Sequence, residues 1–254
     1  MLETNDVNKS FGGLRALSSV SVSIARHTVT AVIGPNGAGK STLMNVISGF
    51  IAPDTGTITV DQRSIVGMRP HGVCAAGVAR TFQNLQMFSD MTALEAVATG
   101  RHLHRRTSLV AELLMLPVAR RTDAVAADEA DALLDRLAVP AEYRRRRAGD
   151  LPYGLQRRVE IARALATEPA YLLLDEPAAG LNDEESAALG RTLVSLARDG
   201  LGIALIEHDI DLVMNVSDRV FVMDAGAVIA SGTPTEIRAD PMVIRAYLGG
   251  HPDG

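Results

Sequence analysis

The sequence has few features of a secreted, membrane-spanning or nucleic-acid-binding protein. It contains one cysteine, Cys74, among 254 residues, which excludes an internal disulfide framework and suits a reducing cytosol. No uncharged apolar run approaches the roughly 18 residues that a transmembrane helix requires, and we expect the polar N-terminus not to be a signal peptide. With 30 acidic and 25 basic residues, the net charge of −5 argues against general nucleic-acid binding. We therefore expect a soluble chain whose role at any membrane depends on a partner.

A glycine-rich run predicts a phosphate-binding loop. It fits the pattern of a glycine, four free positions and then Gly-Lys-Ser/Thr, and its residues are Gly34-Pro35-Asn36-Gly37-Ala38-Gly39-Lys40-Ser41-Thr42. An apolar run, residues 28–33, precedes it, and apolar residues at helical spacing follow it. We expect the backbone amides to converge on phosphates, Lys40 to meet the β- and γ-phosphates, and the Ser41 hydroxyl to ligate Mg²⁺. The alternative is a glycine-rich turn followed by a surface lysine.

Two further apolar runs end in polar residues, as the run before the glycine loop does. Residues 171–174 lead into Asp175 and Glu176, and residues 203–206 lead into Glu207 and His208. Short apolar runs separated by helical segments predict buried parallel strands in an α/β fold. Ligands gather at the carboxyl ends of such strands. We therefore expect all three polar endings to lie around the same phosphates.

These polar residues suit the hydrolysis of a nucleotide. The segment that ends at Asp175 has the form of a Walker B strand, whose carboxylate holds Mg²⁺ through water. Glu176 is positioned to orient the water that attacks the γ-phosphate, and His208 to hydrogen-bond that phosphate. The alternatives are a carboxylate pair that caps the next helix and a histidine that is only a satisfied polar residue.

The middle of the chain has a helical pattern from about residue 90 to residue 150. One helix face is predicted from intervals of three and four between Ala126, Ala130, Leu133, Leu134 and Leu137. Another short helix is expected over residues 109–116, stopped by Pro117. We interpret this region as an inserted helical subdomain. Later, the spacing of Asn182 and Glu185 predicts a capping box, and residues 220–229 a hairpin.

In order along the chain, these motifs resemble the ATP-binding-cassette family. The resemblance rests on the glycine loop, Gln83 in the run Arg80-Thr81-Phe82-Gln83, residues 151–165, residues 171–177 and His208. It implies one nucleotide-binding domain over residues 1–254. Its P-loop NTPase (RecA-like) core would cover residues 1–88 and 160–254, with a helical subdomain over about 89–159 and N-terminal antiparallel strands.

The resemblance also implies roles for single residues. Gln83 would be the Q-loop glutamine, which contacts Mg²⁺ and the attacking water. Phe11 would stack on adenine, although a place in the core fits the sequence equally well. Asn182 stands at the D-loop position. The signature segment, which faces the ATP of a second cassette, would contain Leu151, Pro152, Tyr153 and Gly154.

Several marks are similar to the ATPase subunits of branched-chain amino-acid importers, the Liv type. They include residues 11–14, 80–84, 179–182, 207–209 and 246–249. This branch implies ATP and Mg²⁺ as cofactors, membrane permease subunits, a second ATPase subunit and, indirectly, a solute-binding protein. It places the chain on the cytoplasmic face of the membrane. Urea or amide importers and lipopolysaccharide-export systems share several of these marks and remain alternatives. A non-catalytic regulatory cassette and a soluble cassette acting on DNA or ribosomes are hypotheses from other classes.

The signature segment departs from the pattern Leu-Ser-Gly-Gly-Gln at two informative positions. Pro152 replaces the serine, which normally offers a hydroxyl and an N–H to the opposite γ-phosphate, and proline offers neither. Leu155 replaces the final glutamine. Asn182 replaces the usual D-loop aspartate, a change common in this branch. We therefore expect an asymmetric dimer with a paralogous partner, rather than two identical subunits, and a weakened second site.

Overall fold

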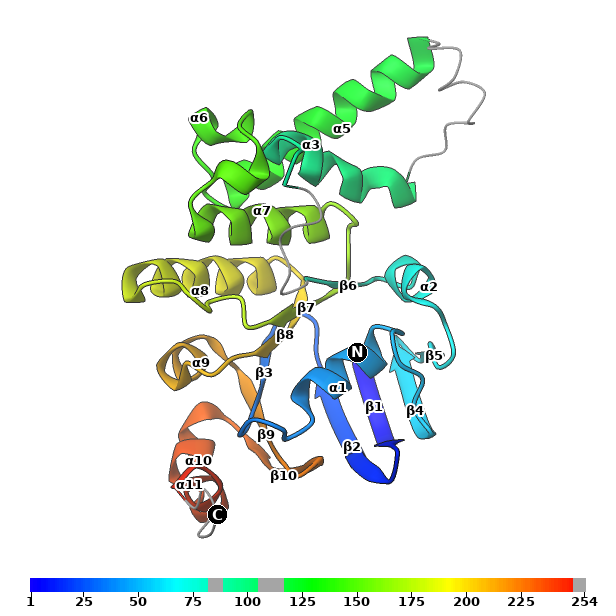
Figure 1. Cartoon of the computed structure of the whole chain (residues 1–254), viewed down its shortest axis with the longest axis vertical. Coiled ribbons are helices and arrows are strands. Elements are labelled where there is room, and N and C mark those ends of the chain that lie inside the picture. The colour runs from blue at the N-terminus through cyan, green and yellow to red at the C-terminus, as the bar shows by residue number, and fades with distance from the viewer. Residues whose placement is uncertain (82–88, 105–116, 249–254) are drawn as a thin grey trace. The chain divides into compact units, whose positions relative to one another are not determined.

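The computed structural model describes residues 1–81, 89–104 and 117–248 (Figure 1). It divides into two compact units, one formed by residues 1–80 and 170–254 and the other by residues 81–169. The sequence placed the helical subdomain at about 89–159, so the second unit is wider at both ends. The predicted boundary at residue 159 falls inside the helix that runs from Tyr153 to Leu165. A continuous helix belongs to one unit, so the boundary lies beyond its end.

The first unit is built on a six-stranded sheet with the order β10-β9-β3-β8-β7-β6. Five of its strands run parallel, and β10 pairs antiparallel to β9 as the predicted hairpin. All residues of β3, β7 and β8 are buried, which confirms the three apolar runs as buried parallel strands. The strands are β3 (Val29–Ile33), β6 (Val78–Arg80), β7 (Tyr171–Asp175), β8 (Gly202–Ile206), β9 (Arg219–Asp224) and β10 (Ala227–Gly232).

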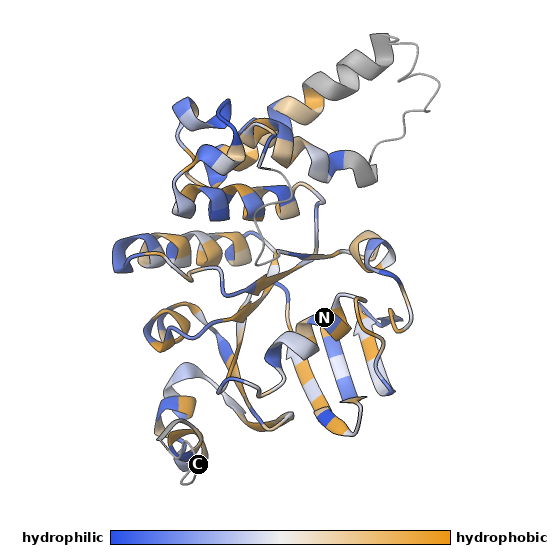
Figure 2. Ribbon diagram, in the orientation of Figure 1, coloured by the Kyte–Doolittle hydropathy of each residue, from blue (hydrophilic) through white to orange (hydrophobic). Residues whose placement is uncertain are grey.

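A second sheet in this unit contains the expected N-terminal antiparallel strands. Its order is β2-β1-β4-β5, and each neighbouring pair is antiparallel. Along β1 and β2 the hydropathy varies from residue to residue, as one buried face requires (Figure 2). The strands are β1 (Leu2–Phe11), β2 (Leu14–Ile24), β4 (Thr55–Val60) and β5 (Arg63–Ser64).

Helices cover both faces of the six-stranded sheet. Successive residues of a strand point to opposite sides, so strands that are buried at every residue need a covering layer on each face. Val32 of β3 belongs to the core cluster that includes α1 and the antiparallel sheet. Its neighbours Ala31 and Ile33 pack instead in the cluster with α9, α10 and α11. The helices of this unit are α1 (Lys40–Ile47), α2 (Pro70–Ala75), α8 (Asp183–Arg198), α9 (Ile210–Val216), α10 (Pro234–Ala239) and α11 (Pro241–Leu248).

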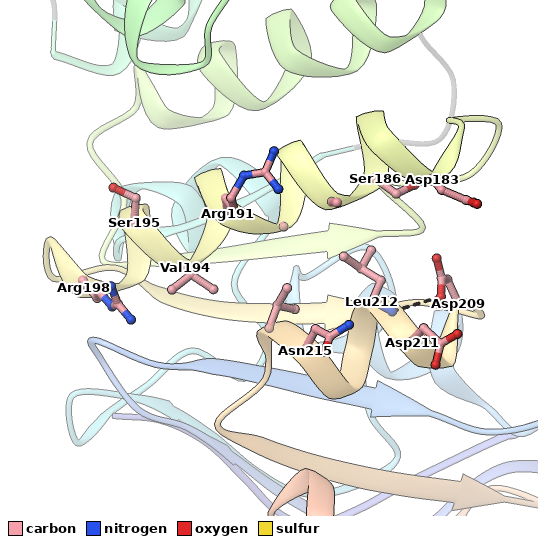
Figure 3. Close-up of a pocket in the computed structure, with 13 residues that line it drawn as sticks. Asp183, Ser186, Arg191, Val194, Ser195, Arg198, Asp209, Asp211, Leu212 and Asn215 are labelled. Carbon is pink, nitrogen blue, oxygen red and sulfur yellow. Dashed lines mark hydrogen bonds between the residues drawn. The ribbon is translucent and has the colours of Figure 1, made fainter.

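Helices α8 and α9 lie against each other beside the sheet (Figure 3). The predicted capping box is confirmed at the start of α8, where Asn182 and Glu185 bond reciprocally. Gly190 permits the close approach, because a Cβ atom there would lie 2.8 Å from Val216 Cγ1 and 2.9 Å from Leu212 Cδ1. Polar residues border a shallow groove between the helices.

The second unit is helical. Of the face predicted for its long helix, Ala126, Ala130 and Leu134 are buried and Leu133 is half-buried, while Leu137 is buried just after the helix ends at Arg136. The helix expected over residues 109–116 lies outside the described residues. Pro117 begins α5, as proline suits a first helical position. The elements are α3 (Ala93–Ala98), η2 (Thr99–His104), α5 (Pro117–Arg136), α6 (Ala141–Arg144), η3 (Ala148–Asp150) and α7 (Tyr153–Leu165). Among the described residues, no helix has the length and apolarity needed to span a membrane.

Candidate active site

The glycine loop connects the carboxyl end of β3 to the first turn of α1. Gly34 has a φ of 149°, and a Cβ atom there would lie 2.0 Å from the carbonyl oxygen of Met223. Gly39 has a φ of 98° at the N-cap of α1, where a Cβ atom would lie 2.5 Å from the carbonyl oxygen of Ala16. Both positions therefore require glycine. In the described structure α1 has no side-chain cap and no acidic residue in its first turn, so its dipole favours an anion at this end.

Lys40 lies inside the loop and is 6% exposed. Its Nζ atom donates hydrogen bonds to the carbonyl oxygens of Gly34 at 2.7 Å and Pro35 at 2.9 Å. Burial lowers the pKa of Lys40, and the charges of Glu176 and Asp175 oppose that effect. The loop thus holds an ammonium within the electrostatic range of both strand-end carboxylates.

The other loop residues leave one side of the loop open. Asn36 and Gly37 are exposed, and Ala38 is buried, donating its N–H to the Pro35 carbonyl oxygen at 3.2 Å. Ser41 is exposed at the first turn of α1, and Thr42 is half-buried. The Ser41 hydroxyl is therefore accessible to a ligand at this end of the helix.

Asp175 ends β7 and is 4% exposed. Its Oδ2 atom accepts a hydrogen bond from Arg80 at 2.9 Å. Arg80 also donates to Asn45 Oδ1 on α1 at 2.7 Å and to Oγ of Ser48, the C-cap of α1, at 3.1 Å. The other carboxylate oxygen, Oδ1, is buried and accepts no hydrogen bond from the described residues. A bare, buried carboxylate oxygen beside a phosphate loop fits a hydrated Mg²⁺.

Glu176 and His208 contact each other across the ends of β7 and β8. His208 Nε2 lies 2.8 Å from Glu176 Oε1. Glu176 has a φ of 50°, a conformation that non-glycine residues seldom adopt and that often occurs at functional sites. The His208 side chain is 48% exposed, so the pair faces solvent rather than the core. The structure thus brings together Lys40, Asp175, Glu176 and His208, as the convergence of strand ends predicts.

Sequence patterns assign no role to two residues of this site. Arg80 stands in the run before Gln83, and its carboxylate partner is 95 positions away. Glu207 is a polar residue at a strand end, yet it is 3% exposed and accepts a hydrogen bond from Ala178 N at 2.6 Å. Long-range contacts of this kind leave no local pattern in a sequence.

The signature segment lies in the second unit at the start of α7. Pro152 is its N-cap residue and makes no side-chain cap bond, while its carbonyl oxygen accepts from Leu155 N at 2.9 Å. Leu151 is buried and Gly154 is half-buried. Tyr153 is 42% exposed, and its hydroxyl accepts a hydrogen bond from Arg157 at 2.6 Å. The proline therefore serves as the N-cap of α7, and at this position the segment lacks the hydroxyl and the N–H that a serine would offer.

The remaining predicted site residues have different outcomes. Phe11 is 45% exposed at the end of β1, so the alternative of a core residue is wrong. Lys9 Nζ lies 5.4 Å from the centroid of its ring. Asn182 caps α8 through its side chain. Gln83 lies outside the described residues.

Comparisons with known proteins agree with this site. The family model of ABC transporters matches residues 17–179, and the model of branched-chain amino acid ATP-binding cassette transporters matches residues 227–253. The ATP-binding protein LivG of Salmonella typhimurium, named for high-affinity branched-chain amino acid transport, is 43% identical over 98% of both chains. BraF of Pseudomonas aeruginosa, of the same description, is 42% identical over 98% of both chains.

Solved structures give the same result. A nucleotide-free ATP-binding cassette from an ABC transporter aligns with a TM-score of 0.85 and 33% identity, covering 97% of this chain and 98% of that one. The ADP conformation of a cassette aligns with a TM-score of 0.84 and 33% identity, covering 98% of both chains. A P-loop core with an ordered set of cassette motifs defines an ATPase of the transport class. The chain belongs to the ATP-binding-cassette family of ABC transporters, in the branch of the Liv-type ATP-binding subunits.

Proposed function

We propose that this chain binds and hydrolyses ATP to drive the import of branched-chain amino acids. The observation that carries the proposal is the meeting of one buried lysine, two strand-end carboxylates and one histidine at the phosphate loop. The names of the relatives support the solute class. Urea import and lipopolysaccharide export are alternatives for the solute. Uptake by the full transporter, measured with a panel of amino acids and urea, distinguishes them.

In the proposed mechanism, the loop amides and the dipole of α1 receive the phosphates of ATP. Lys40 exchanges its bonds to Gly34 and Pro35 for bonds to the β- and γ-phosphates. Ser41, Asp175 and Gln83 would hold Mg²⁺, which supplies charge neutralisation of the phosphates when bound. Phe11, exposed and next to a cation, supplies a ring for adenine.

Glu176 orients the attacking water and accepts its proton. His208, whose Nε2 bonds the same carboxylate, hydrogen-bonds the γ-phosphate and so couples the base to the presence of ATP. Most of the rate enhancement comes from positioning and from charge stabilisation, because phosphoryl transfer asks for little covalent chemistry from the protein.

The first test is Glu176→Gln. The amide keeps the size of the side chain but cannot accept the proton, so turnover should fall by about 10²–10⁴-fold. ATP affinity, measured by calorimetry, should remain within a fewfold of the unsubstituted value. Near-normal turnover would reject the assignment of Glu176 as the base.

We further propose that the chain works on the cytoplasmic face of the membrane, bound to permease subunits and closing on a paralogous second cassette. A solute-binding protein would deliver the amino acid to the permease. Pro152 supports the asymmetric arrangement, because it offers neither a hydroxyl nor an N–H to the partner's γ-phosphate.

The asymmetry predicts the effect of Pro152→Ser. Serine suits the N-cap of α7 and restores both missing donors, so ATP turnover of the reconstituted transporter should rise. The steady-state ATPase rate of the complex is the measurement, with Leu155→Gln alone as a comparison at the other departure. An unchanged rate with Pro152→Ser would count against the weakened second site.

A further inference from the structure

We propose that Glu207 is a positioning residue for the two catalytic loops, which follow β7 and β8 and carry Glu176 and His208. It connects these loops and keeps the two side chains within hydrogen-bonding distance of each other. This inference rests on the proposed function, because it assigns Glu207 to the same hydrolysis site. Its basis is a single buried carboxylate that bonds the backbone of both loops.

The backbone connection between the two loops ends just where the catalytic residues begin. Parallel strands β7 and β8 pair Asp175 with Ile206. The last backbone bond between them runs from Glu176 N to the Ile206 carbonyl oxygen at 2.9 Å. Beyond this point the chains separate, one toward α8 and the other toward α9. Some other contact must keep the loops together if the Glu176–His208 distance is to stay at 2.8 Å.

The Glu207 side chain makes that contact. Its Oε1 atom accepts from Ala178 N at 2.6 Å, on the loop that carries Glu176. Its Oε2 atom accepts from His208 N at 3.2 Å, on its own loop. Ala178 begins the turn that continues to α8, since its carbonyl oxygen accepts from Leu181 N at 3.0 Å. The carboxylate therefore fixes the path of the chain on both sides of the catalytic pair.

The burial of Glu207 makes the arrangement dependent on a carboxylate. The residue is 3% exposed, so water has little access to the Glu207 carboxylate. Burial also raises its pKa, and the two backbone amides lower it. A glutamine at this position has one acceptor oxygen and one NH₂ group. Only one of the two backbone N–H donors would then have an acceptor, and the other would face the NH₂ group.

The test compares Glu207→Gln with a matched variant elsewhere. Glu236 also accepts a backbone N–H, from Thr233 at 2.7 Å, but it lies at the start of α10 away from the site. Glu236→Gln makes the same change at an exposed acceptor of one backbone N–H, and it does not touch the loops that carry Glu176 and His208. Both are measured in the full transporter for kcat, KM for ATP and thermal unfolding.

Glu207→Gln should lower kcat about tenfold or more, because Glu176 and His208 lose their fixed positions, while the KM for ATP changes little. Glu236→Gln should leave kcat unchanged and cost little thermal stability, because the residue is exposed and glutamine can keep the capping-box bond. In the isolated chain, ¹⁵N–¹H NMR spectra can follow the signals of the six histidines. With Glu207→Gln, only the chemical shifts of His208 should change. An unchanged kcat, or a kcat loss equal to that of Glu236→Gln, would overturn the proposal.

Two further variants complete the design. Glu207→Asp keeps the charge but is one methylene shorter, so it should give an intermediate kcat. It is used in place of Glu207→Gln if the glutamine variant does not fold. A wild-type kcat for Glu207→Asp would then overturn the proposal. Glu176→Gln separates the two levels of inference. If Glu176→Gln is inactive and Glu207→Gln is fully active, only the role of Glu207 fails. If both are active, the proposed hydrolysis site fails.

Discussion

At the scale of single residues, Arg80 joins three parts of the site. Its guanidinium bonds Asp175 at the end of β7, Asn45 on α1 and Ser48, the C-cap of α1. The Arg80 and Asp175 side chains are 10% and 4% exposed, so this is a buried ion pair. Loss of one partner from a buried pair leaves a charge without compensation, and this costs more than the pair itself contributes.

We therefore expect Arg80→Met to destabilise the chain by about 3–5 kcal/mol. Asp175→Asn should also destabilise it, but the double variant should lose less than the sum of the two, because it leaves no orphaned charge. Urea unfolding of the three variants measures this coupling. The exposed pair of Arg238 and Asp211, at 3.9 Å, is the control, and Arg238→Met should change stability by less than about 0.5 kcal/mol. Additive losses for Arg80 and Asp175 would contradict the argument.

At the scale of elements, the close contact between α8 and α9 depends on Gly190. The side chains of Val216 and Leu212 occupy the space that a Cβ atom would need. Asp209, the N-cap of α9, follows His208 directly, and Asn182 caps α8 just after the loop of Glu176. The packing of these two helices therefore fixes the positions at which both catalytic loops end.

Gly190→Ala should force the two helices apart and destabilise the chain by about 1–3 kcal/mol, despite the higher helix propensity of alanine. Ala187, exposed on the same helix and bordering the groove, provides the opposite substitution. Ala187→Gly should cost about 1 kcal/mol, from helix propensity alone. Thermal unfolding measures both. A Gly190→Ala variant as stable as the unsubstituted chain would show that the contact can relax freely.

The elements also explain what the sequence can and cannot predict. Strands β3, β7 and β8 are buried on every residue, so their apolar runs are unambiguous and their polar endings converge as expected. The capping box of α8 was predictable because its two residues are three positions apart. Arg80 and Glu207 were not, because their partners are 95 and 29 positions away. Phe11 was undecided because alternation along β1 is broken by register shifts.

At the scale of the whole molecule, the chain contributes two separate parts to the proposed transporter. One unit carries the phosphate loop with Asp175, Glu176 and His208, and the other carries the signature segment at the start of α7. In a cassette dimer each ATP would use the first part of one subunit and the second part of the other. The departures at Pro152 and Leu155 would then affect the partner's ATP rather than this chain's own.

The central claim is that the site at the phosphate loop binds a triphosphate together with its magnesium ion. Calorimetric titration with ATP, in the presence of Mg²⁺ and in the presence of EDTA, tests this claim most directly. The unsubstituted chain should bind ATP in both and more tightly with Mg²⁺. Asp175→Asn should lose the gain from Mg²⁺ while it still binds ATP, and Lys40→Ala should bind ATP weakly in both. Equal affinities for the three proteins with and without Mg²⁺, or no binding by the unsubstituted chain, would contradict the account.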